Sequence, residues 1–294
     1  MQNPFKAQLK RENLPYRPIL GEASAKTVKG EKIGYLTAIC YLVPDEKLCP
    51  FAVMAGCFEP CLKSAGRGAF NNTQKARAAK TAFFRENQRA FMLSMAADIW
   101  SHARRAEKFG LIPLVRPNGT SDIPFENIQI DGRTIFQIFA DVQFYDYTKH
   151  PSRNLTGKTA GNYDLTYSFS AITPKPISIK GLINPANKRT AVVFQKQADI
   201  PAEFRGWPVI DGDDTDVRHI EPAGGESLGT GDVTLLGRDI VHSVVNPLGK
   251  ISAAIHVYDG PFLTVERSMW NAETLQEERF DINAVAKGMP QSMR

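Results

Sequence analysis

Three closely spaced cysteines are the residues of this sequence best suited to do chemistry. Cys49, Cys57 and Cys61 stand in the spacing C-x7-C-x3-C, and the fourth cysteine of the 294-residue chain, Cys40, lies just upstream. Thiolates gathered in one loop are suitable ligands for an iron–sulfur cluster or for another soft metal ion. Three of them can hold a [4Fe-4S] cluster by three irons, which leaves the fourth iron open to a substrate or cofactor.

Zinc is the main alternative to iron in this loop. Cys40 or a histidine such as His102 would then be the fourth ligand, but tetrahedral zinc sites usually contain two short-spaced cysteine pairs. This loop contains only one such pair, Cys57 and Cys61. Unligated thiols are a further alternative, and structural disulfides are disfavoured because the reducing cytosol keeps thiols reduced.

A glycine turn at residues 118–122 is a second candidate for binding. Its residues are Asn118, Gly119, Thr120, Ser121 and Asp122. Hydroxyl, amide and carboxylate groups on one turn could hold an amino-acid moiety or a ribose, and so bind a cofactor. The same residue types also form hydrogen-bonded turns that bind nothing.

Two further polar segments supply catalytic candidates. Lys149 and His150 bring a cation and an imidazole that could bind an anion or move a proton. Asp211 and Asp213 lie in an acidic segment that lacks the spacing of a calcium loop. This segment could bind a second metal or ribose hydroxyls, pair with Arg218, or form an acidic turn.

The cysteine loop lies between a predicted strand and a predicted helix. Residues 32–43 form a nearly continuous apolar and β-branched run, which is typical of a strand buried on both faces. A helix is expected from Asn72 to about Lys108, closed by Gly110. Its apolar face consists of Phe84, Phe91, Met95 and Ile99.

Five later apolar runs are each followed by polar side chains. They are residues 111–116, 142–147, 165–170, 191–194 and 207–210. Ligands bind at the carboxyl ends of strands in parallel α/β sheets and barrels, where these polar residues would converge. We therefore expect the cysteine loop and the polar segments to line one shared pocket at the carboxyl ends of the strands.

The fold class that these elements indicate is α/β. Only the first connection contains a long helix, and the later connections are rich in proline. We therefore expect residues 1–220 to form a partial (β/α) barrel or an open, mostly parallel sheet. Residues 221–294 contain several glycines and short segments such as 251–258, and are expected to be an irregular, β-rich elaboration of the same domain.

The positive charge is concentrated in the first third of the chain. Residues 1–110 contain 18 Lys and Arg against 9 Asp and Glu, whereas the whole chain has a net charge of +5. Eight of these basic residues fall on the first predicted helix: Lys75, Arg77, Lys80, Arg85, Arg89, Arg104, Arg105 and Lys108. This helix could face a nucleic acid, a nucleotide or another anionic substrate, or it could be an ordinary solvated helix surface.

The sequence indicates a cytoplasmic protein. The segment Met1–Lys10 lacks the apolar region of a secretory signal, and no stretch approaches the roughly 20 apolar residues of a membrane span. No membrane association is expected.

Several short motifs, taken in order, resemble a bacteriophage family of the gene product eighty-eight type. They are Cys-Pro at 49–50, Gly-Cys at 56–57, Cys-Leu at 61–62, Ala-Gly-Arg-Gly at 65–68, Asn-Gly-Thr-Ser-Asp at 118–122, Tyr-Thr-Lys at 147–149 and Val-Ile-Asp-Gly-Asp at 209–213. The resemblance covers roughly residues 35–220. It implies a phage or prophage origin, and hence the cytoplasm of the host cell.

A three-cysteine loop after the first strand also resembles, more loosely, the radical S-adenosylmethionine enzymes. That resemblance implies a [4Fe-4S] cluster on Cys49, Cys57 and Cys61, with S-adenosylmethionine bound in part by residues 118–122. The first hypothesis is therefore an iron–sulfur enzyme that acts on a nucleotide, nucleic acid or other anionic substrate. The alternative is a non-enzymatic phage protein, braced by zinc or a closed cluster, that binds nucleic acid or a host protein.

Overall fold

The computed structural model describes residues 2–21, 30–43, 45–58, 70–193, 200–204, 207–210, 212, 217–221, 268–270 and 277–279. Contacts divide the chain into two units, residues 1–235 and 236–294. In the second unit the described residues form an antiparallel pair, β11 (Ser268–Trp270) with β12 (Glu277–Arg279). The predicted segment 251–258 lies outside the described residues, and the boundary at residue 220 stays a prediction.

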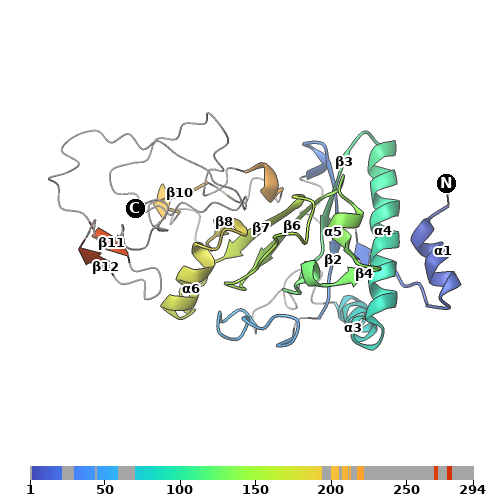
Figure 1. The fold of residues 1–294 in the computed structure, drawn as a ribbon, viewed down its shortest axis with the longest axis horizontal. Helices are drawn as coiled ribbons and strands as arrows, with labels where there is room; N and C mark the ends of the chain where they lie inside the picture. Colours follow the sequence, from blue (N-terminus) through green and yellow to red (C-terminus); the bar gives the residue numbers. More distant parts are fainter. Residues whose placement is uncertain are drawn as a thin grey trace, which may run out of the picture. The chain divides into compact units, whose positions relative to one another are not determined.

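A six-stranded sheet forms the centre of the first unit (Figure 1). Its order is β1 (Leu20–Gly21), β2 (Tyr35–Cys40), β3 (Ile112–Arg116), β6 (Gln143–Thr148), β7 (Tyr163–Ser168) and β8 (Asn187–Ala191). Strand β1 is antiparallel to β2, while the other neighbours are parallel and follow the order of the chain. The strands of the described part form an open sheet and not a closed barrel, which confirms the α/β prediction.

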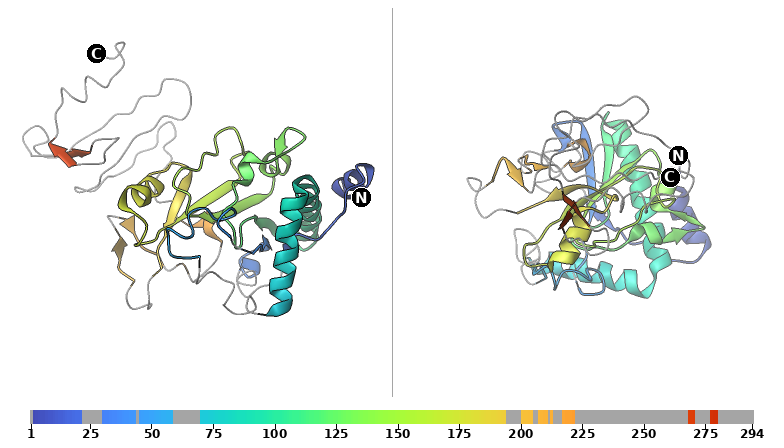
Figure 2. Two further views of the ribbon diagram at one scale, coloured as in Figure 1. Left: turned by 90° about the horizontal axis from the view of Figure 1, so that it is seen from below. Right: turned by 60° about the vertical axis from the view of Figure 1, so that its left-hand side comes forward.

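The α-helices in the described part of this unit are α1 (Pro4–Arg11), α3 (Asn71–Glu86), α4 (Gln88–Lys108), α5 (Ile135–Ile138) and α6 (Lys175–Leu182). Two views of the ribbon show α4 between the sheet and α1 (Figures 1 and 2). The single helix predicted over 72–108 is two helices, because Asn87 leaves the helical conformation at φ −146° and its side chain caps Ala90 of α4. Gly110 closes α4 at φ +67°, as predicted.

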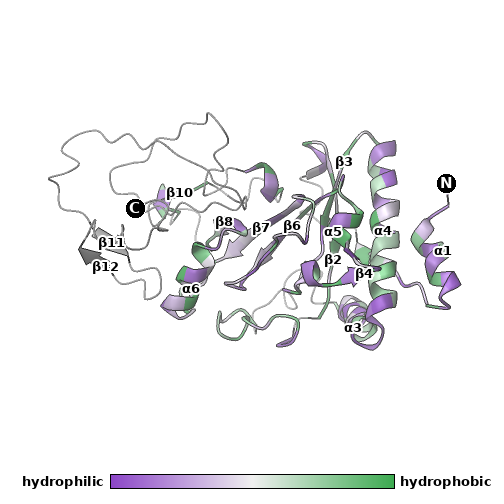
Figure 3. Cartoon of the chain, in the orientation of Figure 1, coloured by the Kyte–Doolittle hydropathy of each residue, from purple (hydrophilic) through white to green (hydrophobic). Residues whose placement is uncertain are grey.

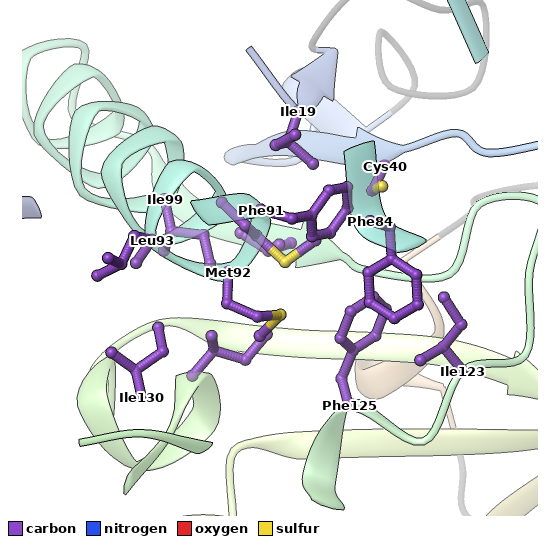
Figure 4. Packing of buried hydrophobic residues seen from close by; sticks show 14 of the residues in the cluster. Ile19, Cys40, Phe84, Phe91, Met92, Leu93, Ile99, Ile123, Phe125 and Ile130 are labelled. Carbon is purple, nitrogen blue, oxygen red and sulfur yellow. The ribbon is translucent and has the colours of Figure 1, made fainter. Parts of the chain in front are cut away.

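One face of the sheet packs against α4. Ala38, Val115, Phe144 and Tyr163 are in register on neighbouring strands, and residues paired in this way share a face. The last three belong to the main hydrophobic core together with Phe91. Figure 4 shows Cys40 and Ile19 beside the aromatic side chains of Phe84 and Phe91 in this core. The predicted apolar helix face is confirmed, because all four of its residues are buried.

The opposite face of the sheet is less apolar. Leu114 and Tyr145 pack there against Val217, which precedes the short 3-10 helix η4 (Arg218–Ile220). Strands β6 and β7 are mainly hydrophilic along their length (Figure 3). This polar character explains why their apolar runs are shorter in the sequence than that of β2.

In the described part of the first unit, two short hairpins lie outside the main sheet. Strands β4 (Gln129–Ile130) and β5 (Arg133–Thr134) follow the 3-10 helix η2 (Phe125–Asn127) and are joined by Asp131 and Gly132, which both have positive φ. Strands β9 (Glu203–Phe204) and β10 (Trp207–Pro208) pair antiparallel. The strand expected at 207–210 is therefore not part of the parallel sheet, and Pro208 lacks the N–H that a central strand needs.

The helices in the described part of the chain are all too short or too polar to cross a bilayer.

Candidate functional site

The carboxyl ends of the parallel strands meet at one edge of the sheet, which we call the carboxyl edge. The Gly119 N–H donates to the Cys40 carbonyl oxygen at 2.8 Å, so the segment after β3 crosses the end of β2. Lys149 Nζ donates to the Ser168 carbonyl oxygen at 2.9 Å and thereby joins the ends of β6 and β7. These contacts bring together the polar segments that follow β3, β6 and β7, as the sequence predicted.

The cysteine loop, described over residues 45–58, crosses this edge. Its Leu48 carbonyl accepts from the Asp122 N–H at 2.8 Å, and its Ala55 carbonyl accepts from Ser170 Oγ at 2.8 Å. The ring of Phe51 packs edge-on against His150, with 4.8 Å between the centroids. The loop therefore contacts the segments that follow three different strands.

Gly56 allows the loop to approach this edge closely. Its φ is +65°, and a Cβ atom there would lie 2.1 Å from Cδ1 of Ile172. The positive φ therefore favours glycine here, and a larger residue would also require the exposed Ile172 side chain to move.

Two of the three predicted metal-binding cysteines lie on the described part of the loop. Cys49 and Cys57 are half-buried, and their Sγ atoms lie 4.0 Å from the Thr120 carbonyl oxygen and 3.6 Å from the Ala52 carbonyl oxygen, respectively. Cys61 lies outside the described residues. Among the residues that are described, no three His, Cys, Asp or Glu side chains are grouped to hold a metal ion. The assignment of the three cysteines as ligands stays a prediction.

Cys40 and His102, the alternative zinc ligands, both lie in the core. Cys40 is fully buried, and burial raises the pKa of its thiol to about 12. His102 is buried on α4, with Nε2 2.9 Å from the Leu36 carbonyl oxygen in the middle of β2. Both side chains are thus buried, and the zinc alternative stays a prediction.

The turn at residues 118–122 is buried and hydrogen-bonded internally. Asn118 Oδ1 accepts from Ser121 Oγ at 2.7 Å and from the Ile123 N–H at 2.8 Å. Thr120 Oγ1 accepts from the Leu42 N–H at 3.0 Å. A Cβ atom on Gly119 would lie 2.6 Å from the Cys40 carbonyl oxygen, so only glycine fits there. The turn thus has a structural function, and its contact with a cofactor stays a prediction.

Arg153 is the centre of a buried ion-pair network beneath this turn. Only 2% of its side chain is exposed, and its guanidinium contacts Asp122 at 3.0 Å and Glu126 at 2.7 Å. Asp122 also accepts from the Lys149 N–H at 2.8 Å. Neither Arg153 nor Glu126 is singled out by the sequence, since no motif connects residues that lie 27 positions apart.

Asp146 is the titratable group of this region whose environment is most unusual. It is buried, and it accepts hydrogen bonds from the Asn118 N–H at 2.9 Å and from the Tyr163 hydroxyl at 2.9 Å. Burial raises the pKa of its carboxyl from 3.8 to about 7, although Arg116 nearby and these hydrogen bonds act in the opposite direction.

This raised pKa predicts a pH dependence of stability. Between about pH 4 and pH 7 the folded chain holds a proton on Asp146 that the unfolded chain has lost, so the free energy of unfolding falls as pH rises through this window. The full change is at most roughly 4 kcal/mol. Urea denaturation at pH 5 to 8 should show a flatter dependence for Asp146→Asn than for the wild type. Parallel curves for the two proteins would contradict the assignment.

Lys149 and His150 both lie at the carboxyl edge, next to the cysteine loop. Lys149 Nζ donates to Ser168 Oγ at 3.1 Å; burial lowers the pKa of this amine, and the nearby Cys57 and Asp122 oppose that effect. Burial also lowers the pKa of His150, whose Nδ1 accepts from the Ser152 N–H at 3.0 Å. The other catalytic candidates, Asp211 and Asp213, lie outside the described residues.

Most of the basic residues predicted to form an anion-binding helix have partners within the protein. These pairs are Arg77 with the Tyr41 ring, Lys80 with the Ile19 carbonyl, Arg85 with Asp45, Arg89 with Glu12 and Asp131, and Arg104 with Glu107. At the end of α4, Lys108 is exposed and Arg105 lies over the ring of Phe109, with 5.9 Å between Cζ and the centroid. Phe109 is itself 60% exposed.

Comparison with known proteins gives one positive result. A family model described as Gene product 88 matches residues 18–234, which is well over half of the chain. No curated protein and no solved structure matches the sequence. The match supports the resemblance to a phage family, and the comparisons give no support to the looser resemblance to radical S-adenosylmethionine enzymes.

Proposed function

The chain belongs to the Gene product 88 family of phage proteins. We propose that it is an iron–sulfur protein. Cys49, Cys57 and Cys61 would hold the cluster at the carboxyl edge of the sheet. The observation that carries the proposal is the position of the cysteine loop across the segments that follow β3, β6 and β7. A cluster held there would lie beside Lys149 and His150, where a ligand bound at the strand ends could reach it.

The donor groups suit this assignment. The two described loop cysteines are half-buried at the edge, whereas Cys40 is enclosed in the core. Thiolates are soft ligands that select iron–sulfur clusters or zinc. Since Cys40 and His102 are both engaged in the core, a three-thiolate site is favoured over a four-ligand zinc site.

The side chains at the carboxyl edge would have different roles in such a site. Lys149 would balance the negative charge of the Cys57 thiolate, and the hydrogen bonds from Asp122 and Ser170 would fix the loop over the strand ends. A bound cluster with one open iron would supply one-electron chemistry, for which S-adenosylmethionine is the candidate cofactor. The proposed substrate is a nucleotide, a nucleic acid or another anion, and the protein would then be an enzyme.

Anaerobic purification tests the proposal directly. The protein is expected to be brown, with a broad visible absorption band and about four irons per chain. A colourless protein that contains zinc would rule the cluster out. Incubation of the reduced protein with S-adenosylmethionine then shows whether the cluster only binds or also cleaves this cofactor. Formation of 5′-deoxyadenosine requires both a bound cluster and bound S-adenosylmethionine.

Nucleic-acid binding by the end of α4 is a second candidate function. The surface consists of Arg105, Lys108 and the exposed ring of Phe109. Cations that flank an exposed aromatic ring suit a single strand, because its phosphates pair with the cations and a base stacks on the ring. This surface does not depend on the cysteine loop.

Replacing both Arg105 and Lys108 with glutamine is expected to weaken binding of a single-stranded oligonucleotide by about tenfold. Fluorescence anisotropy at several salt concentrations would measure the affinity and its salt dependence. The matched control is Lys10→Gln with Lys75→Gln, which removes the same charge from other exposed positions. Equal losses in both double variants, or wild-type binding that is insensitive to salt, would exclude a specific surface at the end of α4.

A further inference from the structure

The face of the sheet away from α4 presents a continuous row of polar side chains at its carboxyl end. This row, which we call the tyrosine face, consists of Arg116, Tyr147, Lys149, Thr166 and Ser168. Tyr147 and Thr166 are in register between β6 and β7, and the guanidinium of Arg116 lies over the Tyr147 ring at 4.8 Å from its centroid. Residues two positions apart on a strand share a face, and Lys149 Nζ contacts Ser168 Oγ at 3.1 Å.

One hydroxyl of this row has no partner. Thr166 is 2% exposed, and its Oγ1 makes no hydrogen bond within the described part of the chain. A buried hydroxyl that lacks a hydrogen bond lowers the stability of the fold, so native structures rarely retain one without a reason. A ligand with an acceptor atom would supply the missing partner.

The charges on the two faces of the sheet differ in kind. Asp122 and Glu126 contact Arg153 on the side of α4. Asp164 is in register with Tyr145 and so lies on the tyrosine face, where it pairs with Arg189 at 2.6 Å. On the tyrosine face, Arg116 and Lys149 contribute two positive charges from the ends of β3 and β6, which lie on one side of Thr166 in β7. Arg116 also pairs with Asp146, with 3.8 Å between Nε and Oδ1.

We infer that the tyrosine face binds a small molecule through its phosphate or carboxylate group, held by Arg116, Lys149 and the Thr166 hydroxyl. A guanidinium, an ammonium and a hydroxyl are the donors that oxyanions take up in proteins. Because Lys149 also lies beside Cys57, the ligand would lie next to the cysteine loop. The inference deepens the proposed function by naming the substrate class for the same edge, but its test does not depend on the metal.

Replacing Thr166 with valine isolates the unpartnered hydroxyl, because the two side chains have nearly the same shape. Titration of the purified protein with inorganic phosphate, and separately with acetate, would be followed by the amide NMR signals of residues 147–149 and 166–168. Saturable shifts are expected for at least one anion, which identifies the group that is bound. Thr166→Val is expected to weaken the binding about tenfold while its urea midpoint rises or stays unchanged. Lys149→Met is expected to weaken it as well.

The matched control is Thr81→Val. Thr81 Oγ1 accepts from the Val43 N–H at 2.9 Å and donates to the Arg77 carbonyl at 3.0 Å, so its loss should lower the urea midpoint and leave anion binding intact. Absence of saturable shifts with both anions, or wild-type affinity in Thr166→Val, would overturn the inference. A fall in the urea midpoint of Thr166→Val equal to that of Thr81→Val would also overturn it, since the hydroxyl would then have an internal partner. Iron measured in the same samples shows whether the proposed function fails independently.

Discussion

Replacing Cys57 with alanine is expected to remove nearly all iron and visible absorption from the protein. A cluster held by three thiolates loses a third of its protein ligands when one of them is removed, and the exposed iron then dissociates or oxidises. Cys57 is half-buried in a loop fixed across the carboxyl edge, so a small substitution there should leave the sheet folded. Iron analysis and the visible spectrum of anaerobically purified protein provide the measurement, with circular dichroism to show that the fold is retained.

Cys40→Ala is the matched control for this prediction. Cys40 is the same residue type only 17 positions earlier, but its side chain packs in the core beside Phe84 (Figure 4). Iron content should be unchanged, while a small cavity lowers the free energy of unfolding by about 1–2 kcal/mol. Equal loss of iron from both variants would mean that the loop cysteines have no special part in metal binding.

Replacing Arg153 with methionine is expected to cost about 3–5 kcal/mol of stability. The substitution keeps most of the side-chain volume but leaves Asp122 and Glu126 without their cation in a buried site. Asp122 also holds Leu48 of the cysteine loop through its N–H, so disorder at Asp122 should loosen the loop. Urea denaturation measures the first effect, and faster alkylation of Cys57 in the folded protein measures the second.

A charge-matched control is available on the surface. Arg85 pairs with Asp45, but 48% of its side chain is exposed, so Arg85→Met should cost less than about 1 kcal/mol. Adding Glu126→Gln to Arg153→Met should restore part of the lost stability, because it removes one of the two unpaired charges. If Arg153→Met costs no more than Arg85→Met, the buried network does not stabilise the fold.

Local pattern was sufficient to predict several elements. The apolar run before the cysteines predicted β2, and the spacing of Phe84, Phe91, Met95 and Ile99 predicted a buried helix face. The first signal is the continuous apolar run of a strand buried on both faces, and the second is the helical period of a helix that buries one side. The break at Asn87 also had a local signal, since an Asn directly before an apolar run is a good N-cap.

The position of the strand at 207–210 could not be decided in the same way. Its apolar run resembles those of the sheet strands, but β10 pairs only with β9 in an antiparallel hairpin. Which strand pairs with which depends on the whole topology and not on the composition of four residues. The prediction of a mostly parallel sheet therefore holds for β2, β3, β6, β7 and β8 but not for this strand.

Sequence by itself thus determined β2, β3, β6 and β7, the position of the cysteine loop after β2, and the meeting of strand ends at one edge. Only the tertiary structure separated Cys40 from Cys57, because the alternation of β2 directs Cys40 into the core while the loop carries Cys57 across the edge. Tertiary structure alone likewise paired Arg153 with Glu126 and left the Thr166 hydroxyl unpartnered. The physical reason is the sequence distance over which each feature is decided. Backbone periodicity depends on neighbouring residues, whereas the partner of a buried charge or hydroxyl depends on the register of strands that are far apart in the chain.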